Sequence, residues 1–228
     1  MPKFGADSRD SRRAERVVAF IDGMNLHFGI LSQGLRSHTW VDPVSLVRKL
    51  LRPSQDLVAV KFFTSRIPGS RPGEDSEVAV RRERDRQVQD IYLDALAVLD
   101  HMEVHYGHFL NKERRCGSCG KRWPQHEEKK TDVLIACHLV MAAMDEACDQ
   151  VILISGDGDL SPPVRIIRER FPLMRVIVAF PPGRRSAELQ RSAHGHVHIC
   201  NSKVRRSQLP RVVITPGGVR LERPLDWH

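Results

Sequence analysis

The sequence is poor in aromatic residues, contains no long apolar run and has an odd number of cysteines. Aromatic side chains make up 6% of the residues, so an extended platform for stacking nucleic-acid bases is not evident. No apolar run reaches the length of a membrane span, and the polar residues 1–16 lack the apolar core of a secretory signal. Five cysteines without such a signal argue against a disulfide framework. We therefore expect a cytoplasmic protein with no membrane segment.

The length and charge indicate one basic domain with additions at both ends. The 228 residues fit a single domain, and the 41% of hydrophobic residues are enough for a core. The net charge of +8 suggests a polyanionic partner, because Lys and Arg neutralise phosphates and release counterions. We expect a flexible basic arm at 1–16, a main domain at 17–200 and a C-terminal tail at 201–228 with a hairpin around 216–218.

Strand and helix patterns alternate along the main domain. The continuous apolar run at 17–21 is typical of a strand that is buried on both faces. Further strands are expected at 57–64, 102–106, 151–154, 175–180 and 196–200, and helices at 43–51, 78–100, 131–147, 161–170 and 184–194. The alternation predicts an α/β fold in which helices cover both faces of a mostly parallel sheet, with a polar insertion at 107–128.

Four aspartates stand where expected strands end or a helix begins. Asp22 follows the first strand, Asp157 and Asp159 follow the fourth, and Asp132 lies at the start of a helix. Ligands of parallel sheets bind beyond the carboxyl ends of the strands, so we expect the four carboxylates to converge. Unpaired carboxylates raise one another's pKa, and a hard cation such as Mg²⁺ or Mn²⁺ removes that conflict. The pattern therefore predicts a metal site.

Each of these residues also has a purely structural interpretation. Asp22 could form a turn with Gly23, Asp132 could cap its helix, and the segment 157–159 could be a solvated loop. Asn25 could cap the next helix or hold a water on the metal. The combination of these residues after two buried strands favours the metal site.

Five segments resemble the motifs of NYN domains, a branch of the PIN-like nucleases, and occur in that family's order. They are Phe20-Ile21-Asp22-Gly23-Met24-Asn25, Glu127-Glu128-Lys129-Lys130-Thr131-Asp132-Val133, Ile154-Ser155-Gly156-Asp157-Gly158-Asp159-Leu160, Ala179-Phe180-Pro181-Pro182-Gly183-Arg184 and Arg223-Pro224-Leu225-Asp226-Trp227. The resemblance extends from about residue 17 to the C-terminus. It implies a PIN-like three-layer α/β/α sandwich and metal-dependent cleavage of RNA, with an endoribonuclease as the expected enzyme.

The resemblance also implies roles for individual residues. It assigns the acidic cluster to four positions, which are Asp22, Asp132, Asp157 and Asp159. Asn25 lies beside this cluster, and Ser155 would support it at the strand end. Lys129 matches a family lysine that could contact phosphate or pair with Glu128. Water activated at the metal would then attack the RNA phosphodiester.

Three positions depart from the family pattern. Leu134 stands where the family often has Asn, Ala142 where it often has Asp, and Gly158 where a serine is usual. These departures motivate an alternative, a non-catalytic RNA- or partner-binding module with a degenerate metal site. A phosphatase is less favoured, because Asp22-Gly23-Met24 lacks the second aspartate of an Asp-x-Asp nucleophile motif.

The insertion carries a second candidate metal site. Cys116 and Cys119 have the spacing of a zinc knuckle, and His108 and His126 are tentative further ligands. Cys200 with a neighbouring histidine, or another subunit, could contribute instead. The Cys-x-x-Cys insertion resembles that of some NYN-domain proteins. A redox role is less favoured, since the pair lies in a polar insertion rather than at a helix start.

Arginines that follow expected strands are candidates for substrate binding. Arg184 and Arg185 follow the strand at 175–180, and Arg66 follows the strand at 57–64. Such residues would position a phosphate backbone without reading bases. We expect single-stranded or structured RNA as the partner. The residues do not exclude DNA, and a protein partner such as an antitoxin would be compatible with a cytoplasmic nuclease.

Overall fold

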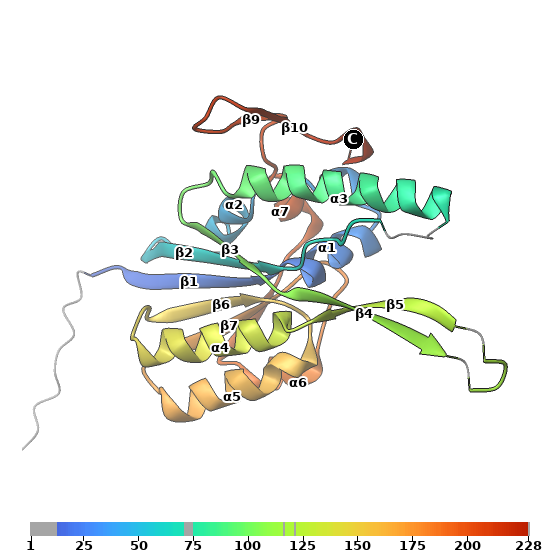
Figure 1. Cartoon of the computed structure of the whole chain (residues 1–228). Helices are drawn as coiled ribbons and strands as arrows, with labels where there is room; N and C mark the ends of the chain where they lie inside the picture. The colour runs from blue at the N-terminus through green and yellow to red at the C-terminus, as the bar shows by residue number, and fades with distance from the viewer. Residues whose placement is uncertain (1–12, 71–74, 116, 121, 228) are drawn as a thin grey trace, which may run out of the picture.

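A parallel six-stranded sheet forms the centre of the described chain (Figure 1). The computed structural model describes residues 13–70, 75–115, 117–120 and 122–227, so most of the expected basic arm lies outside it. The strand order is β3-β2-β1-β6-β7-β8, and all neighbouring pairs are parallel. The strands are β1 Glu15–Asp22, β2 Gln55–Thr64, β3 Met102–Tyr106, β6 Gln150–Ile154, β7 Arg175–Phe180 and β8 Gly195–His198.

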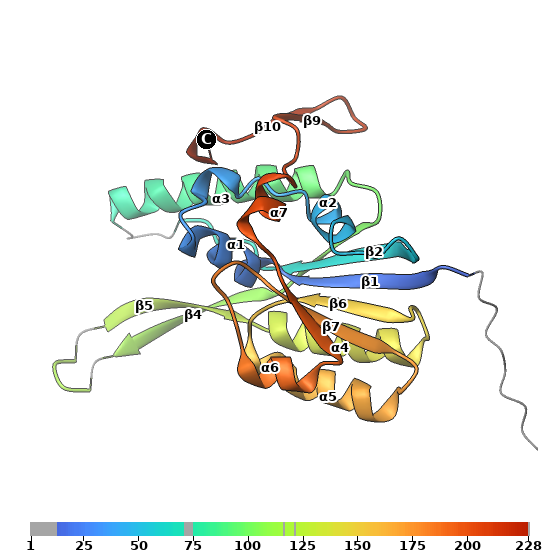
Figure 2. The same cartoon turned by 180° about the vertical axis from the view of Figure 1, so that it is seen from behind.

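Helices cover both faces of this sheet, because its central strands present apolar side chains to both. In β1, Ala19 and Ile21 pack into one buried cluster, whereas Val18 and Phe20 pack into the other. One layer holds α1 Gly23–Ser32, α2 Pro43–Arg48, α3 Ser76–Leu96 and α7 Asn201–Arg205, and the other holds α4 Thr131–Met144, α5 Ser161–Arg170 and α6 Ala187–Ser192 (Figures 1 and 2). The expected α/β/α sandwich is therefore confirmed.

The helices begin where caps and prolines fix the first turn. The Asp42 carboxylate accepts a hydrogen bond from the Ser45 backbone N at 2.8 Å, and Pro43 follows it in the first turn of α2. All the strands and helices predicted for the main domain are present, with ends that differ by a few residues. The sequence patterns do not predict α1 and α7. Among the described residues, no helix combines the length and the apolar character needed to cross a bilayer.

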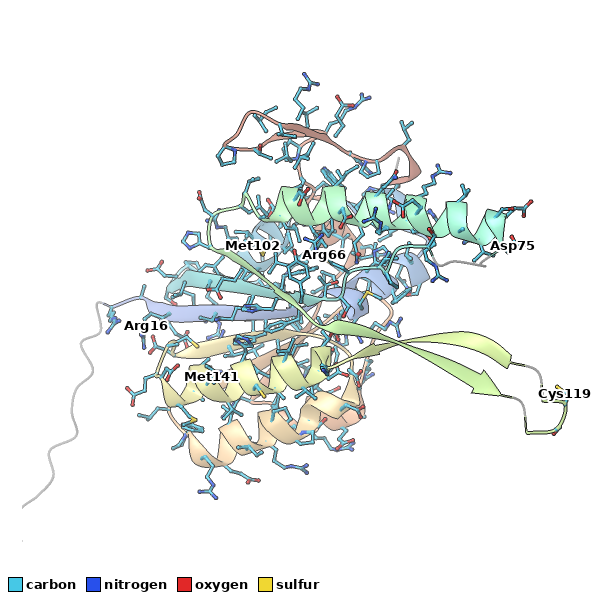
Figure 3. All side chains as sticks on the ribbon, in the orientation of Figure 1. Arg16, Arg66, Asp75, Met102, Cys119 and Met141 are labelled. Atoms are coloured by element: carbon cyan, nitrogen blue, oxygen red, sulfur yellow. The ribbon has the colours of Figure 1, made fainter. Side chains whose placement is uncertain are left out.

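The polar insertion forms an antiparallel ribbon of two strands, β4 His108–Arg115 and β5 Arg122–Lys129. The ribbon leaves the body on the side where the parallel strands end (Figures 1 and 2). Cys119 is exposed in the turn at its far end (Figure 3). Cys116 and the side chains of both strands lie outside the described residues.

The C-terminal tail packs on the same core as the main domain. It contains the expected hairpin, formed by β9 Val212–Ile214 and β10 Arg220–Glu222. Trp227 is 8% exposed and its ring lies 5.9 Å from that of Trp40 and 5.4 Å from that of Tyr92. The indole N–H of Trp40 donates to the carbonyl of Pro210 at 2.8 Å. These contacts join the tail to α3 and to Trp40, which precedes α2.

Candidate functional site

A cleft lies at the carboxyl edge of the sheet, at the switch point where successive strands are added on the other side of β1. Strand β1 has β2 on one side and β6 on the other, so the crossovers leave it in opposite directions. This is the position at which open parallel sheets bind ligands. The cleft has a volume of about 220 Å³. Its lining comes from four segments and consists of Asp22, Met24, Asn25, Phe28, Thr131, Asp132, Asp157 and Arg184.

Asp22 is the most buried carboxylate of the cleft, with an exposed fraction of 5%. It ends β1 and caps α1, because one carboxylate oxygen accepts the backbone N–H of Asn25 at 2.9 Å. The other oxygen accepts the Ser155 hydroxyl at 3.1 Å. Hydrogen bonds to the charged form and the positive end of a helix both stabilise a carboxylate. Asp22 therefore links strand and helix directly rather than forming a separate turn with Gly23.

Asn25 and Ser155 tie the end of β1 to the end of β6. The side-chain oxygen of Asn25 accepts the backbone N–H of Gly156 at 2.9 Å, so this residue does not cap α1. Ser155 is fully buried, and its hydroxyl accepts the backbone N–H of Asp157 at 3.1 Å in addition to donating to Asp22. Both side chains thus fix the relative position of two carboxylates.

The two aspartates after β6 lie in different surroundings. Asp157 is half-buried and caps the short 3-10 helix Gly158–Leu160 by accepting the backbone N–H of Asp159 at 3.0 Å. Asp159 is exposed and is not among the residues that line the cleft. The structure therefore brings Asp157 to Asp22 and leaves the Asp159 side chain outside.

The start of α4 forms the wall opposite α1. Lys130 precedes the helix in a left-handed backbone conformation with φ of 78°, a strained state for a residue with a side chain. Thr131 is buried, and its hydroxyl lies 3.3 Å from that of Ser65. Asp132 sits in the first turn, so it does not cap the helix, and it lines the cleft. The side chain of Lys129 lies outside the described residues.

Of the three arginines expected to bind substrate, Arg184 lines the cleft. Its stem is pressed between two glycines, because a Cβ placed on Gly156 would lie 2.7 Å from its Cβ and one on Gly29 would lie 3.2 Å from its Cγ. Within the described residues its Nε is buried without a hydrogen-bond acceptor. Arg185 instead donates to Gln190.

Arg66 is held away from the cleft by other partners. Its guanidinium pairs with Asp90 at 2.7 Å and donates to the Tyr106 hydroxyl at 3.2 Å. The same group lies 4.7 Å from the centre of the Tyr106 ring. Arg66 is not one of the residues that line the cleft.

The carboxylates share one cleft but do not converge on a point. In the part of the chain that the structure describes, no three His, Cys, Asp or Glu side chains lie close enough together to hold a metal ion. The donors that Asp22, Asp132 and Asp157 supply are all oxygens, which is the chemistry that Mg²⁺ and Mn²⁺ prefer. The expected four-carboxylate cluster is thus reduced to three carboxylates around a shared cavity.

The tentative zinc ligands lie along the ribbon. In its register His108 pairs with Lys129 at the base, and His126 pairs with Asn111. Cys119 lies in the turn at the other end (Figure 3). Since a strand rises about 3.3 Å per residue, the seven steps from His108 to Arg115 span about 23 Å of backbone. The zinc site stays a prediction, and the length of β4 separates the turn that carries Cys119 from His108.

Three residues of the cleft are missed by sequence reasoning. Thr131 and Met24 each stand inside one of the family-like motifs and could have been found from them. Phe28 lies four residues after Met24, which places the two on one face of a helix. That signal depends on knowing that residues 23–32 are helical, and the pattern does not predict α1.

This chain is similar to a known protein family and to individual known proteins. A model of the NYN domain family matches residues 16–200. A relative from Pseudomonas putida (strain DSM 28022 / S16), named 6-hydroxy-3-succinoylpyridine 3-monooxygenase, is 24% identical over 242 residues, covering 93% of this chain and 75% of its own. A solved structure of a protein of unknown function from Vibrio parahaemolyticus RIMD 2210633 is 21% identical with a TM-score of 0.47, covering 84% of this chain and 96% of its own. Because this family model matches residues 16–200, well over half of the chain, this chain belongs to the NYN domain family.

Proposed function

We propose that this chain is a metal-dependent ribonuclease that hydrolyses RNA phosphodiester bonds in the cleft between α1 and α4. The observation that carries the proposal is the meeting of Asp22, Asp132, Asp157 and Arg184 around one cavity at the carboxyl edge of the sheet. Membership of a nuclease-like family supports the same chemistry. The proposal includes RNA as the substrate, a cytoplasmic location and zinc in the ribbon. It also assigns the chain to the branch of the NYN family that has a Cys-x-x-Cys insertion.

Mg²⁺ or Mn²⁺ would be held by one or two of the carboxylates of Asp22, Asp132 and Asp157, with waters and a substrate phosphate as its other oxygen ligands. When bound, a divalent cation supplies positive charge that offsets the charge developing on the phosphoryl oxygens and makes water more acidic. Arg184, which lines the same cavity, would bind a phosphate oxygen, because the guanidinium matches phosphate geometry. Asn25 and Ser155 would act through hydrogen bonds that hold Asp22 and the loop after β6 in place.

Two of the three departures from the family pattern, Leu134 and Ala142, lie away from the cleft. Ala142 is buried against the sheet, and its separation of ten positions from Asp132 corresponds to about 15 Å of helix. Leu134 packs against the same core. Neither residue lines the cleft, so the substitutions leave its carboxylates in place. This weakens the case for a non-catalytic module.

A second candidate function follows from the Pseudomonas putida relative, which is named a monooxygenase of a pyridine compound. That relative covers nearly the whole of this chain, so oxidation of a small aromatic heterocycle is an alternative use of the same cleft. Oxygen consumption with 6-hydroxy-3-succinoylpyridine and a reductant would support it. RNA cleavage that depends on the carboxylates would not.

The deciding experiment is cleavage of labelled single-stranded RNA with Mg²⁺, Mn²⁺ or EDTA. Asp157→Asn keeps the oxygen that accepts the backbone N–H of Asp159 while removing the charge, so we expect at least a 100-fold loss of rate in a folded protein. Asp145→Asn changes an exposed carboxylate after the end of α4 and should leave the rate unchanged. Asp159→Asn tests whether the carboxylate outside the cleft contributes. Full Mg²⁺-dependent activity of Asp157→Asn would refute the proposal.

A further inference from the structure

The cleft contains an exposed aromatic side chain. Phe28 lies in the second turn of α1 and is 45% exposed, although it lines a cavity whose other walls carry three carboxylates and an arginine. On the same helix, Leu26 and Ile30 fill the core. Met24, one turn before Phe28, also lines the cavity. The two side chains form an apolar ledge, which we define as Met24 and Phe28.

The ring of Phe28 packs against the ring of the preceding residue, His27. The His27 ring meets it edge to face, with centroids 5.6 Å apart and planes at 71°. His27 is itself packed towards the core, with its ring 6.3 Å from that of Trp227. Phe28 therefore projects from a packed base. A phenyl ring offers no hydrogen bond, so the ligand group that it fits is flat and apolar.

Gly29 allows α1, which carries Met24 and Phe28, to lie against the segment that carries Arg184. A Cβ on this residue would lie 2.8 Å from the carbonyl oxygen of Pro182 and 3.2 Å from Cγ of Arg184. The absence of a side chain allows α1 to approach the 181–184 segment directly. Phe28 precedes Gly29 in α1, and both Phe28 and Arg184 line the cavity. A ligand that uses both has a flat ring close to an anionic group, which is the composition of a nucleotide.

We propose that Phe28, with Met24 beside it, is a stacking subsite for one unpaired nucleobase next to the scissile phosphate. This inference rests on the proposed ribonuclease function and names its substrate class as single-stranded RNA. A base can lie on a protein aromatic ring only when it has left the stack of a duplex, and such stacking tolerates any base. The low aromatic content of the chain is compatible with a single subsite of this kind.

The subsite can be tested by binding in EDTA, which separates it from catalysis. The probe is a single-stranded oligouridylate that carries one 2-aminopurine, whose fluorescence falls when the base stacks. Wild-type protein should quench it, and Phe28→Tyr should do the same. Phe28→Leu should abolish the quenching and weaken binding about fivefold or more, since stacking contributes about 1–3 kcal/mol per base, or about 5- to 150-fold. Ile166→Ala, which changes an exposed apolar residue on α5, should have no effect.

The controls distinguish the two proposals. Arg184→Gln should weaken binding while the oligonucleotide that remains bound is still quenched, because phosphate contact and stacking are separate. The same strand annealed to its complement should bind more weakly to wild type than the single strand. Normal quenching by Phe28→Leu, or equal binding of the duplex, would overturn the stacking subsite. Stacking without Mg²⁺- or Mn²⁺-dependent cleavage would overturn the nuclease proposal and leave the subsite standing.

Discussion

The hydroxyl group of Ser155 holds two carboxylate-bearing segments of the cleft in position. It donates to the Asp22 carboxylate at 3.1 Å and accepts the backbone N–H of Asp157 at 3.1 Å. The residue is fully buried, so water cannot replace either bond. We expect Ser155→Ala to destabilise the fold and to reduce cleavage, because it releases the two carboxylates from each other.

The size of the effect follows from the two bonds. A hydrogen bond to a charged group contributes about 1.5–3 kcal/mol, and a neutral one about 1 kcal/mol. Ser155→Ala should therefore lower the free energy of unfolding by about 2.5–4 kcal/mol. Loss of a group that orients a metal-binding carboxylate commonly reduces activity about 10- to 100-fold, and we expect cleavage to fall in that range.

Ser161 provides a matched control at the start of α5. It is also fully buried, but its hydroxyl has no hydrogen-bond partner within the described residues. Ser161→Ala removes the same group without breaking a hydrogen bond. It should therefore lower the free energy of unfolding by less than about 1 kcal/mol, or raise it. Urea unfolding and RNA cleavage are measured for both variants. Equal losses of stability in the two would refute the role given to Ser155.

Two further predictions concern the tail and His27. Trp227→Ala should lower the free energy of unfolding in urea by about 3–5 kcal/mol, because the residue is 8% exposed. Leu225→Ala, at an 81% exposed position, should have little effect. If Trp227→Ala left the free energy of unfolding unchanged, the tail would not be part of the core. Burial, with a smaller contribution from Arg36, lowers the pKa of His27 below its ordinary value of 6.5. The unfolded chain thus binds more protons between these two pKa values, so stability is complete above about pH 6.5 and falls as the pH decreases. Thermal midpoints from pH 7.5 to 5.5 should fall, and less steeply in His27→Gln; a flat profile would contradict this. The same direction of pKa shift is found for His38, His105, His138 and His194.

The fold could be predicted because its information is local. The run at 17–21 and the runs at 151–154 and 176–180 are apolar at every position, which is the pattern of strands covered on both faces. Helix α2 could be located from Asp42 and Pro43, which act within one turn of each other. The position of Asp22 at the carboxyl edge then followed from strand direction alone.

The side-chain connections of the site could not be predicted, because they join distant parts of the chain. Asn25 contacts the backbone of Gly156, which lies 131 residues away, and no local pattern separates this role from helix capping. Asp157 and Asp159 are two residues apart and look equivalent in the sequence. The 3-10 turn between them directs one into the cleft and leaves the other exposed.

The position of Arg184 shows what the glycines of separate motifs contribute to the cleft. Its backbone and stem fit between α1 and the loop after β6 only because Gly29 and Gly156 lack a side chain. A methyl group at Gly156 would overlap Cβ of Arg184 at 2.7 Å, and one at Gly29 would overlap the carbonyl oxygen of Pro182 at 2.8 Å. Either change would push the arginine away from Asp22 and Asp157 without altering any charged residue. The cleft is therefore specified as much by close backbone approach as by the carboxylates, and a list of acidic residues alone would not identify it.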